Sequence, residues 1–140
     1  MIKFWKKELS NISEKAEIGE DTIIHSGVHI HDEVKIGQRC QIQAQVFIPN
    51  GVIIEDDVFV GPQVCFTNDR KLVLREEFKP IPTLIKKGVK IGANSTIFCG
   101  ITLGEDSIIG AGSVITKDVP ANEMWFGNPA KFIKKVKYDL

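Results

Sequence analysis

The sequence predicts an all-β protein built as a coiled solenoid, and two observations support this fold class. One is a six-residue period of apolar residues that runs without a polar interruption through Ile18, Ile24, Ile30, Ile36, Ile42, Ile48, Ile54, Val60 and Phe66. The other is the return of that period after a gap, at Ile91, Ile97, Leu103, Ile109 and Ile115. A helix would repeat every 3.6 residues and a plain strand every two, so neither produces this spacing. A fixed short repeat is typical of a solenoid.

The repeat has a simple geometrical meaning. Each six-residue unit supplies one short extended side and a turn, so three units close a triangular coil of 18 residues. A second series, two residues before the first, runs from Ala16 to Val64 and resumes from Val89 to Ser113, and we expect it to fill the interior of the coils. We call the apolar residues of the first series the corner residues. Glycines that directly follow them, such as Gly37 after Ile36, suit turns that a Cβ would crowd.

Composition limits the classes of protein that fit. The 140 residues are expected to form one domain, residues 1–140, and the 18 basic residues balance the 18 acidic residues. This balance does not favour a nucleic-acid partner. No apolar run approaches the length of a membrane span and no signal peptide is visible, so no membrane association and a cytoplasmic location are expected. The three cysteines lack metal-ligand spacing, which favours a reducing compartment.

The first two segments are a cap and a block of coils. Residues 1–11 break the repeat, and Phe4, Trp5 and Leu9 are expected to cover the open end of the first coil. Residues 12–66 then form the first coils. Their outward positions include Phe47, Ile53 and Phe59, each worth about 1.5–3 kcal/mol if buried. An oligomer interface would bury them; scattered surface hydrophobic residues are the alternative.

Polar residues that are 18 apart should stack along one edge of the solenoid. Asp32, Asn50 and Asn68 have this spacing, with His31 and Asp69 beside them. Such side chains can hold an amine or a hydroxyl group. Asp and Asn also favour turns for local reasons, so a purely structural role remains open, mainly for Asp32 and Asn50. Asn68 and Asp69 differ because they open a long insertion.

Three further segments complete the chain. Residues 67–84 leave the repeat as a long loop, and such excursions from a rigid scaffold often carry function. Residues 85–120 form the last coils. Residues 121–140 are expected to form a turn and a short C-terminal helix, with Phe132, Ile133 and Val136 on its apolar side.

Several motifs stand out along the chain. They are Gly61-Pro62, Phe66-Thr67-Asn68-Asp69, Pro82-Thr83-Leu84-Ile85-Lys86-Lys87-Gly88, Ile91-Gly92-Ala93-Asn94, residues 110–120 and Gly127-Asn128-Pro129-Ala130-Lys131. With these motifs the sequence resembles, over nearly the whole chain after residue 12, the hexapeptide-repeat N-acetyltransferases that use acetyl-CoA and act on nucleotide-linked amino sugars. The second and third motifs are narrower and favour the amino-sugar branch, whereas the C-terminal ones are common to many acyltransferases and support coenzyme A. A left-handed β-helix fold is implied by that resemblance.

The resemblance implies a function and a set of site residues. It implies a homotrimer that transfers an acetyl group to the amine of a dTDP- or UDP-linked deoxyamino sugar, for the synthesis of surface polysaccharides such as lipopolysaccharide, without a metal. Asn68 and Asp69 would be catalytic, and His31, Asp32 and Asn50 would bind the sugar substrate. Coenzyme A would lie between subunits and contact Gly92, Ala93, Gly110, Ala111, Lys117, Asn128, Pro129 and Lys131.

Three alternatives are weighed against this interpretation. An O-acetyltransferase of a sugar or serine hydroxyl is the nearest, but such enzymes usually need a histidine base near the thioester and no histidine follows His31. A γ-carbonic-anhydrase-like protein would need three zinc-binding histidines, and His25 and His31 are one repeat apart, at different corners. A non-catalytic scaffold does not explain the C-terminal motifs. The exact sugar stays open, because Asn50-Gly51 stands where the sugar branch often has an acidic residue before the glycine.

Overall fold

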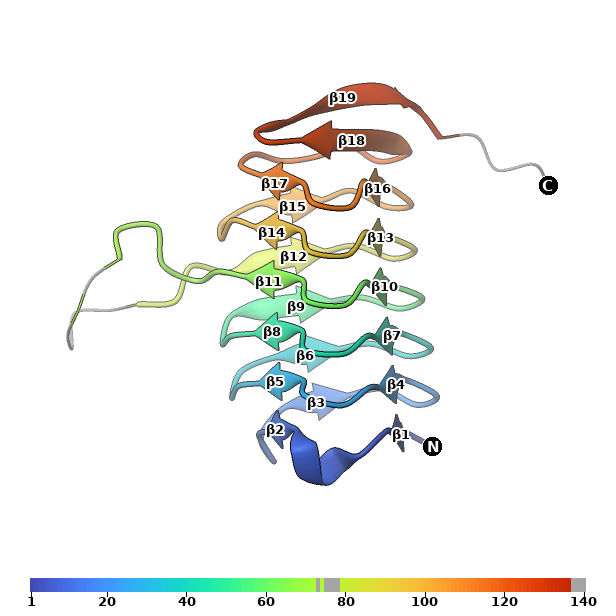
Figure 1. The fold of residues 1–140 in the computed structure, drawn as a ribbon, viewed down its shortest axis with the longest axis vertical. Helices are drawn as coiled ribbons and strands as arrows, with labels where there is room; N and C mark the ends of the chain where they lie inside the picture. The colour runs from blue at the N-terminus through green and yellow to red at the C-terminus, as the bar shows by residue number, and fades with distance from the viewer. Residues whose placement is uncertain (73, 75–78, 137–140) are drawn as a thin grey trace.

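The molecule is a stack of triangular coils whose sides are three parallel β-sheets (Figure 1). The computed structural model describes residues 1–72, 74 and 79–136. The chain starts at one end of the stack and finishes at the other, and an arm leaves the stack between β11 and β12 (Figure 1). The arm corresponds to the expected loop at 67–84, except that Thr83 and Leu84 already belong to β12 and pair with Val52 and Ile53. Residues 73 and 75–78 of the arm lie outside the described part.

We name the three sides sheets A, B and C. Sheet A consists of β1 (Lys3–Phe4), β4 (Ile23–Ile24), β7 (Gln41–Ile42), β10 (Phe59–Val60), β13 (Lys90–Ile91), β16 (Ile108–Ile109), β18 (Glu123–Gly127) and β19 (Ala130–Lys135). Sheet B consists of β2 (Asn11–Ile12), β5 (His29–Ile30), β8 (Phe47–Ile48), β11 (Cys65–Phe66), β14 (Thr96–Ile97) and β17 (Val114–Ile115). Sheet C consists of β3 (Glu17–Ile18), β6 (Lys35–Ile36), β9 (Val52–Ile54), β12 (Thr83–Ile85) and β15 (Thr102–Leu103).

The expected register is confirmed. Ile23 pairs with Gln41, and Gln41 with Phe59, so residues 18 apart stack along each side. The corner residues and the second series point inward: Ile42, Val64 and most of their counterparts are fully buried. One apolar core therefore runs along the axis of the stack.

The turns repeat with the same period as the strands. A residue with positive φ recurs every six positions, at Asp21, Gly27, Glu33, Arg39, Gln45, Gly51, Asp57 and Gln63, and again at Gly88, Asn94, Gly100, Asp106 and Gly112. The glycines that follow the corner residues are a different set. A Cβ on Gly19 would lie 2.6 Å from the carbonyl carbon of Gly37, so these glycines are required by the close stacking of successive coils.

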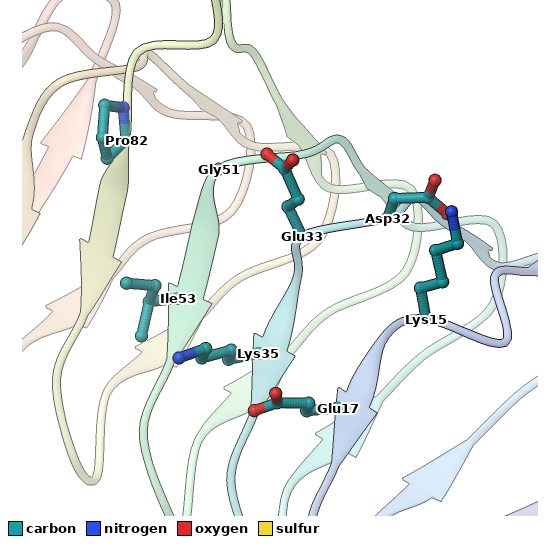
Figure 2. Close-up of a pocket in the computed structure, with 8 residues that line it drawn as sticks. All are labelled: Lys15, Glu17, Asp32, Glu33, Lys35, Gly51, Ile53 and Pro82. Carbon is teal, nitrogen blue, oxygen red and sulfur yellow. The ribbon is translucent and has the colours of Figure 1, made fainter.

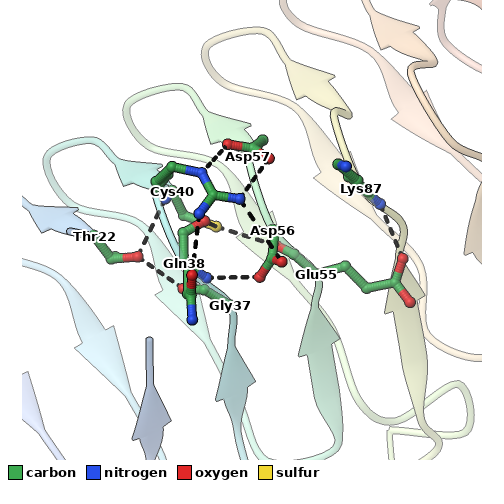
Figure 3. A network of polar contacts seen from close by, with 9 residues as sticks. Thr22, Gly37, Gln38, Cys40, Glu55, Asp56, Asp57 and Lys87 are labelled. Atoms are coloured by element: carbon green, nitrogen blue, oxygen red, sulfur yellow. Dashed lines mark hydrogen bonds and ion pairs between the residues drawn. The ribbon is translucent and has the colours of Figure 1, made fainter. Parts of the chain in front are cut away.

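Side chains also tie adjacent coils together at the turn between sheets C and A (Figure 3). Arg39 donates from Nε and Nη2 to the two carboxylate oxygens of Asp57, over 2.8 and 3.1 Å. The Gln38 backbone N–H donates to Asp56 Oδ1 over 2.8 Å. The Arg39 guanidinium lowers the pKa of Asp57 through its hydrogen bonds and charge. These contacts hold one turn above the next.

The outward apolar residues lie where the register predicts. Phe47 on sheet B, Ile53 on sheet C and Phe59 on sheet A are each more than a third exposed. Because they face three different sides, they do not form one patch on a single chain. The interface that we expect to bury them stays a prediction.

The expected C-terminal helix is wrong. Residues from Glu123 to Lys135 form an antiparallel hairpin, β18–β19, that extends sheet A beyond the last coil. The edge of β16 pairs with β18, and the hairpin buries Trp125 and Ala130 over the open end of the core. A strand satisfies this edge whereas a helix would leave its backbone groups unpaired. Residues 137–140 lie outside the described part.

The first eleven residues form part of a coil. β1 pairs with β4 and β2 pairs with β5, with a short 3₁₀ turn (η1, Lys7–Leu9) between them. Phe4 packs against the core, but Trp5 and Leu9 are at least half exposed. The end of the stack is therefore closed by backbone pairing and Phe4, and the expected apolar stripe that includes Trp5 and Leu9 does not form.

In the described residues, no helix is long and apolar enough to cross a membrane.

Candidate functional site

The polar ladder predicted between sheets B and C is present. Asn68 Nδ2 donates to Asn50 Oδ1 over 2.8 Å, which connects two successive coils. One coil further down, Asp32 Oδ1 accepts a hydrogen bond from Ser13 Oγ. Because the side-chain nitrogen of Asn68 is engaged by Asn50, its side-chain oxygen, Oδ1, is the group that can accept a hydrogen bond from a ligand. We call the line of residues Asp32, Asn50 and Asn68 the acceptor edge.

The loop begins and returns at this same edge. The Ile81 backbone N–H donates to the backbone carbonyl oxygen of Asn68 over 3.1 Å, and Arg70 Nε donates to the backbone carbonyl oxygen of Cys99 over 3.0 Å. Asp69 Oδ1 accepts from the Lys71 backbone N–H over 2.8 Å, so this carboxylate stabilises the first turn of the loop as well as flanking Asn68. The base of the loop therefore fixes both predicted catalytic residues.

Hollows flank the acceptor edge on both sides. The one on the side of sheet C has a volume of about 470 Å³ and brings Asp32 and Glu33 together with Ile53 and Pro82 (Figure 2). One on the side of sheet B, about 380 Å³, is lined by His31, Asp32 and Asn50 among others. Another, also about 380 Å³, lies higher on the edge beside Asp69 and Phe98. Four of the five predicted acceptor-side residues therefore line at least one of these hollows, and the fifth, Asn68, is hydrogen-bonded to Asn50, which lines one of them.

Aromatic rings gather beside the acceptor edge on sheet B. The ring centres of His29 and His31 are 4.4 Å apart, and that of Phe47 lies 5.3 Å from His29 and 5.6 Å from His31. Desolvation, with a smaller contribution from the charge of His31, lowers the pKa of His29. We call His29, His31 and Phe47 the aromatic cluster. Of these three residues, only His31 is predicted from the sequence to bind substrate, and Phe47 is predicted to lie at an oligomer interface, although the 18-residue spacing of His29 and Phe47 predicts that they are neighbours.

A second edge, between sheets A and B, carries most of the predicted coenzyme residues. Gly92, Ala93, Gly110 and Ala111 stack there in two successive coils. A Cβ on Gly92 would lie 2.5 Å from the Ala111 backbone nitrogen, so Gly92 is required first of all by coil stacking. The glycines keep this edge low, and Ala111 and Gly112 remain exposed on it. We call it the glycine edge.

The hairpin completes the upper end of the glycine edge. Asn128 and Pro129 form its exposed tip, and Gly127 N–H donates to Ser113 Oγ over 3.1 Å. Phe126, which the sequence reasoning missed, places its ring over Gly110, 2.2 Å from where a Cβ would be. No sequence signal identifies this contact, because Phe126 lies outside the six-residue repeat.

Two predicted coenzyme residues, Lys117 and Lys131, lie near the β18–β19 hairpin that closes the C-terminal end of the stack. The ammonium group of Lys117 lies 5.5 Å from the centre of the buried Trp125 ring. Lys131 is exposed in β19, paired with Phe126. The two edges themselves bound opposite sides of sheet B. A single chain therefore leaves its predicted acceptor and coenzyme residues one prism side apart.

His25 lies away from the other histidines. Its ring stacks against Trp5, with 6.0 Å between the ring centres, at the corner between sheets A and B. His29 and His31 are at or beside the opposite end of sheet B. Within the described residues, no group of three or more His, Cys, Asp or Glu side chains is arranged to hold a metal ion.

Comparison with known proteins identifies the repeat. Residues 15–50 match the family model "Bacterial transferase hexapeptide (six repeats)", and residues 82–117 match "Hexapeptide repeat of succinyl-transferase". A dTDP-3-amino-3,6-dideoxy-alpha-D-galactopyranose 3-N-acetyltransferase of Aneurinibacillus thermoaerophilus is 51% identical over 49 residues, which are 35% of this chain and 26% of that protein. The aligned regions of the chain thus span about a quarter to a third of the length of the curated relatives.

Solved structures share the fold. Perosamine N-acetyltransferase from Caulobacter crescentus, in complex with CoA and GDP-perosamine, superposes with a TM-score of 0.79 at 22% identity, over 91% of this chain and 54% of that one. AntD, an N-acyltransferase from Bacillus cereus in complex with dTDP and 3-hydroxybutyryl-CoA, gives 0.78 at 22% identity, over 97% and 83%. The six-residue period, the three-sided coils and these matches agree: residues 15–50 and 82–117 are hexapeptide repeats of the kind that these transferase models describe, and the chain has the left-handed β-helix fold.

Proposed function

We propose that the protein transfers an acetyl group from acetyl-CoA to the amine of a deoxyamino sugar linked to dTDP or UDP. The observation that carries the proposal is the acceptor edge. There the Asn50–Asn68 hydrogen bond orients the side-chain oxygen of Asn68, next to Asp69 and the hollows along this edge. The local identity to a dTDP-amino-sugar N-acetyltransferase supports the acceptor class. Structural neighbours with CoA and a nucleotide sugar support the donor and acceptor together.

The chemistry asks little of a general base. A sugar amine with a pKa near 8 is mostly protonated at pH 7, but releasing its proton costs only about 1.4 kcal/mol. The neutral amine attacks the thioester carbonyl carbon, the C–S bond breaks, and an amide and free coenzyme A result. The Asn68 side-chain oxygen would accept a hydrogen bond from the amine and so orient the lone pair of the amine nitrogen. Asp69 or the departing thiolate would receive the proton.

The coenzyme would lie along the glycine edge. Gly92, Ala93 and Ala111 have no side chain beyond a methyl group, which leaves room for the extended pantetheine chain there. Asn128, Pro129, Lys131 and Lys117 would contact the adenine-nucleotide end, where a lysine can act as a point charge toward phosphate. Phe126, over Gly110, adds an apolar wall to the same edge.

The separation of the two edges supports a shared site. We propose a homotrimer in which the glycine edge of one subunit faces the acceptor edge of the next, and in which Phe47, Ile53 and Phe59 become less exposed. A cytoplasmic location and a role in surface-polysaccharide synthesis follow from the nucleotide-linked substrate.

An O-acetyltransferase is the second candidate, because His31 lies on the acceptor edge beside Asp32. It is less favoured because His31 is two coils below Asn68. The test is a panel of dTDP- and UDP-linked amino sugars, serine and simple sugar alcohols, with release of free thiol followed in the presence of acetyl-CoA. Turnover of an amino sugar that is lost in Asn68→Ala supports the proposal. Turnover of hydroxyl acceptors alone, indifferent to Asn68→Ala, would reject it.

A further inference from the structure

The aromatic cluster has no role in the acyl-transfer step as proposed, yet it opens onto a hollow. From its position we infer that His29, His31 and Phe47 form the subsite that holds the nucleobase of the acceptor. This inference rests on the proposed function, because it assigns a part of the same substrate.

The geometry of the cluster suits a flat ligand. His29 comes from β5 and Phe47 from β8 above it, while His31 follows β5 directly. The planes of His29 and His31 are inclined by 48°, and the Phe47 ring meets His31 nearly edge-on, at 72°. Such an arrangement leaves ring faces uncovered by their neighbours. The two histidines border the hollow of about 380 Å³, and Phe47 contacts both from the coil above and is 37% exposed.

The other groups around this hollow match the edge of a base. Asn11 and Asn50 provide amide groups and Asp32 a carboxylate, so hydrogen-bond donors and acceptors lie beside the rings. Proteins recognise single bases by this combination of stacking and polar contacts to the base edge. The lowered pKa of His29 favours an uncharged ring at neutral pH, which suits stacking better than capture of a phosphate.

The distance from the cluster to Asn68 also agrees with the chemistry. His31 lies two coils below Thr67 and Asn68, which is about 10 Å at the usual strand spacing. In a nucleotide-linked sugar, a ribose and two phosphates separate the base from the sugar. The base therefore cannot bind beside the reacting amine, and it should lie further along the same edge. The cluster lies in that direction, away from the loop.

The competing explanation is that the rings only pack across strands to stabilise the first coils. Binding of substrate fragments separates the two explanations. The probes are dTDP, UDP, GDP and inorganic pyrophosphate, titrated by calorimetry into the full chain, alone and with coenzyme A present. The variants are His31→Ala, His31→Phe and, as a matched control, His25→Ala, which removes a stacked histidine from another corner.

We expect at least one nucleoside diphosphate to bind more tightly than pyrophosphate. His31→Ala should weaken that binding by between about five- and a hundred-fold, the usual range for loss of one stacking partner, and leave pyrophosphate binding unchanged. His31→Phe should retain most of the affinity because it keeps an aromatic ring. His25→Ala should bind like the wild type, and circular dichroism melting should show that each variant folds.

Two results would overturn the inference. One is that no nucleoside diphosphate binds more tightly than pyrophosphate; the other is equal affinity in folded His31→Ala and the wild type. Neither result touches the proposed acetyl transfer, which is judged separately by turnover of an amino sugar and its loss in Asn68→Ala. If turnover persists while His31→Ala changes neither affinity nor KM, the subsite is wrong and the function stands.

Discussion

The two edges of sheet B are built in opposite ways. The acceptor edge is a ladder of polar side chains, in which Asn68 is held by Asn50 across two coils. The glycine edge is formed by backbone, because a side chain on Gly92 would collide with the next coil. A change on the acceptor edge should therefore affect chemistry while the fold persists. A change on the glycine edge should affect the fold before it affects any ligand.

The largest expected effect is on stability, at Gly92. Gly92→Ala places a Cβ 2.5 Å from the Ala111 backbone nitrogen, which cannot move without separating two coils. We expect a loss of about 3 kcal/mol or more in the free energy of unfolding, measured by urea denaturation. Gly110→Ala is the matched control, since the Phe126 ring that it meets can rotate away, and it should cost clearly less. Equal losses would show that the stacking contact is not what requires Gly92.

On the acceptor edge, substitutions should lower turnover more than they lower stability. Asn68→Ala should lower kcat with an amino sugar by about a hundred-fold, as is typical for loss of an oriented polar group at a reacting centre, with unchanged affinity for acetyl-CoA. Asn50→Ala should cost less, about ten-fold, because it only releases the Asn68 amide from its fixed orientation. Steady-state kinetics on both variants gives the comparison. A larger effect from Asn50→Ala would mean that Asn50 itself contacts the amine.

Lys117 tests the coenzyme side without disturbing the fold. It is exposed, and its ammonium group lies 5.5 Å from the centre of the Trp125 ring. Lys117→Ala should weaken acetyl-CoA binding by about ten-fold if the ammonium group meets a phosphate, and calorimetry with acetyl-CoA and with dephospho-CoA shows which phosphate. Unchanged affinity for both in a folded variant would leave the lysine as surface charge.

The smallest effect concerns acid stability at the turn between sheets C and A. Arg39 lowers the pKa of Asp57 below its ordinary value of 3.8, so this pair stabilises the fold above that pH and the contribution is lost as pH falls through the lowered pKa. Asp57→Asn should lower Tm slightly at pH 6, and the difference from the wild type should shrink toward pH 3. Glu14→Gln, at an exposed position, is the control. A constant difference across this range would show that charge is not responsible.

Much of the fold could be predicted because the six-residue period determines register directly. Once residues 18 apart are known to stack, Asn50 and Asn68 become neighbours without any knowledge of the turns. The C-terminal hairpin could not be read in this way. The spacing of Phe132, Ile133 and Val136 also fits a helix, and only the unpaired edge of β16 decides in favour of a strand.

The site was predictable to a smaller degree. The register placed each residue on an edge, but it could not reveal that Phe126 packs on Gly110 or that Asp69 caps its own loop. Both contacts depend on segments outside the repeat. The proposed pairing of the acceptor edge with a glycine edge would likewise be a property of the assembly, and a single chain cannot display it.

Mixing two impaired variants tests the shared site most directly. Asn68→Ala damages the acceptor edge, and Ala111→Trp, at an exposed position, should block the glycine edge. When the two variants are unfolded together and refolded, or produced in the same cells, some mixed oligomers contain an intact edge of each kind at one interface. We predict that the mixture acetylates the amino sugar clearly faster than either impaired variant alone. A mixture that forms mixed oligomers, shown by differently tagged subunits, and is no faster than the separate variants would contradict the shared site.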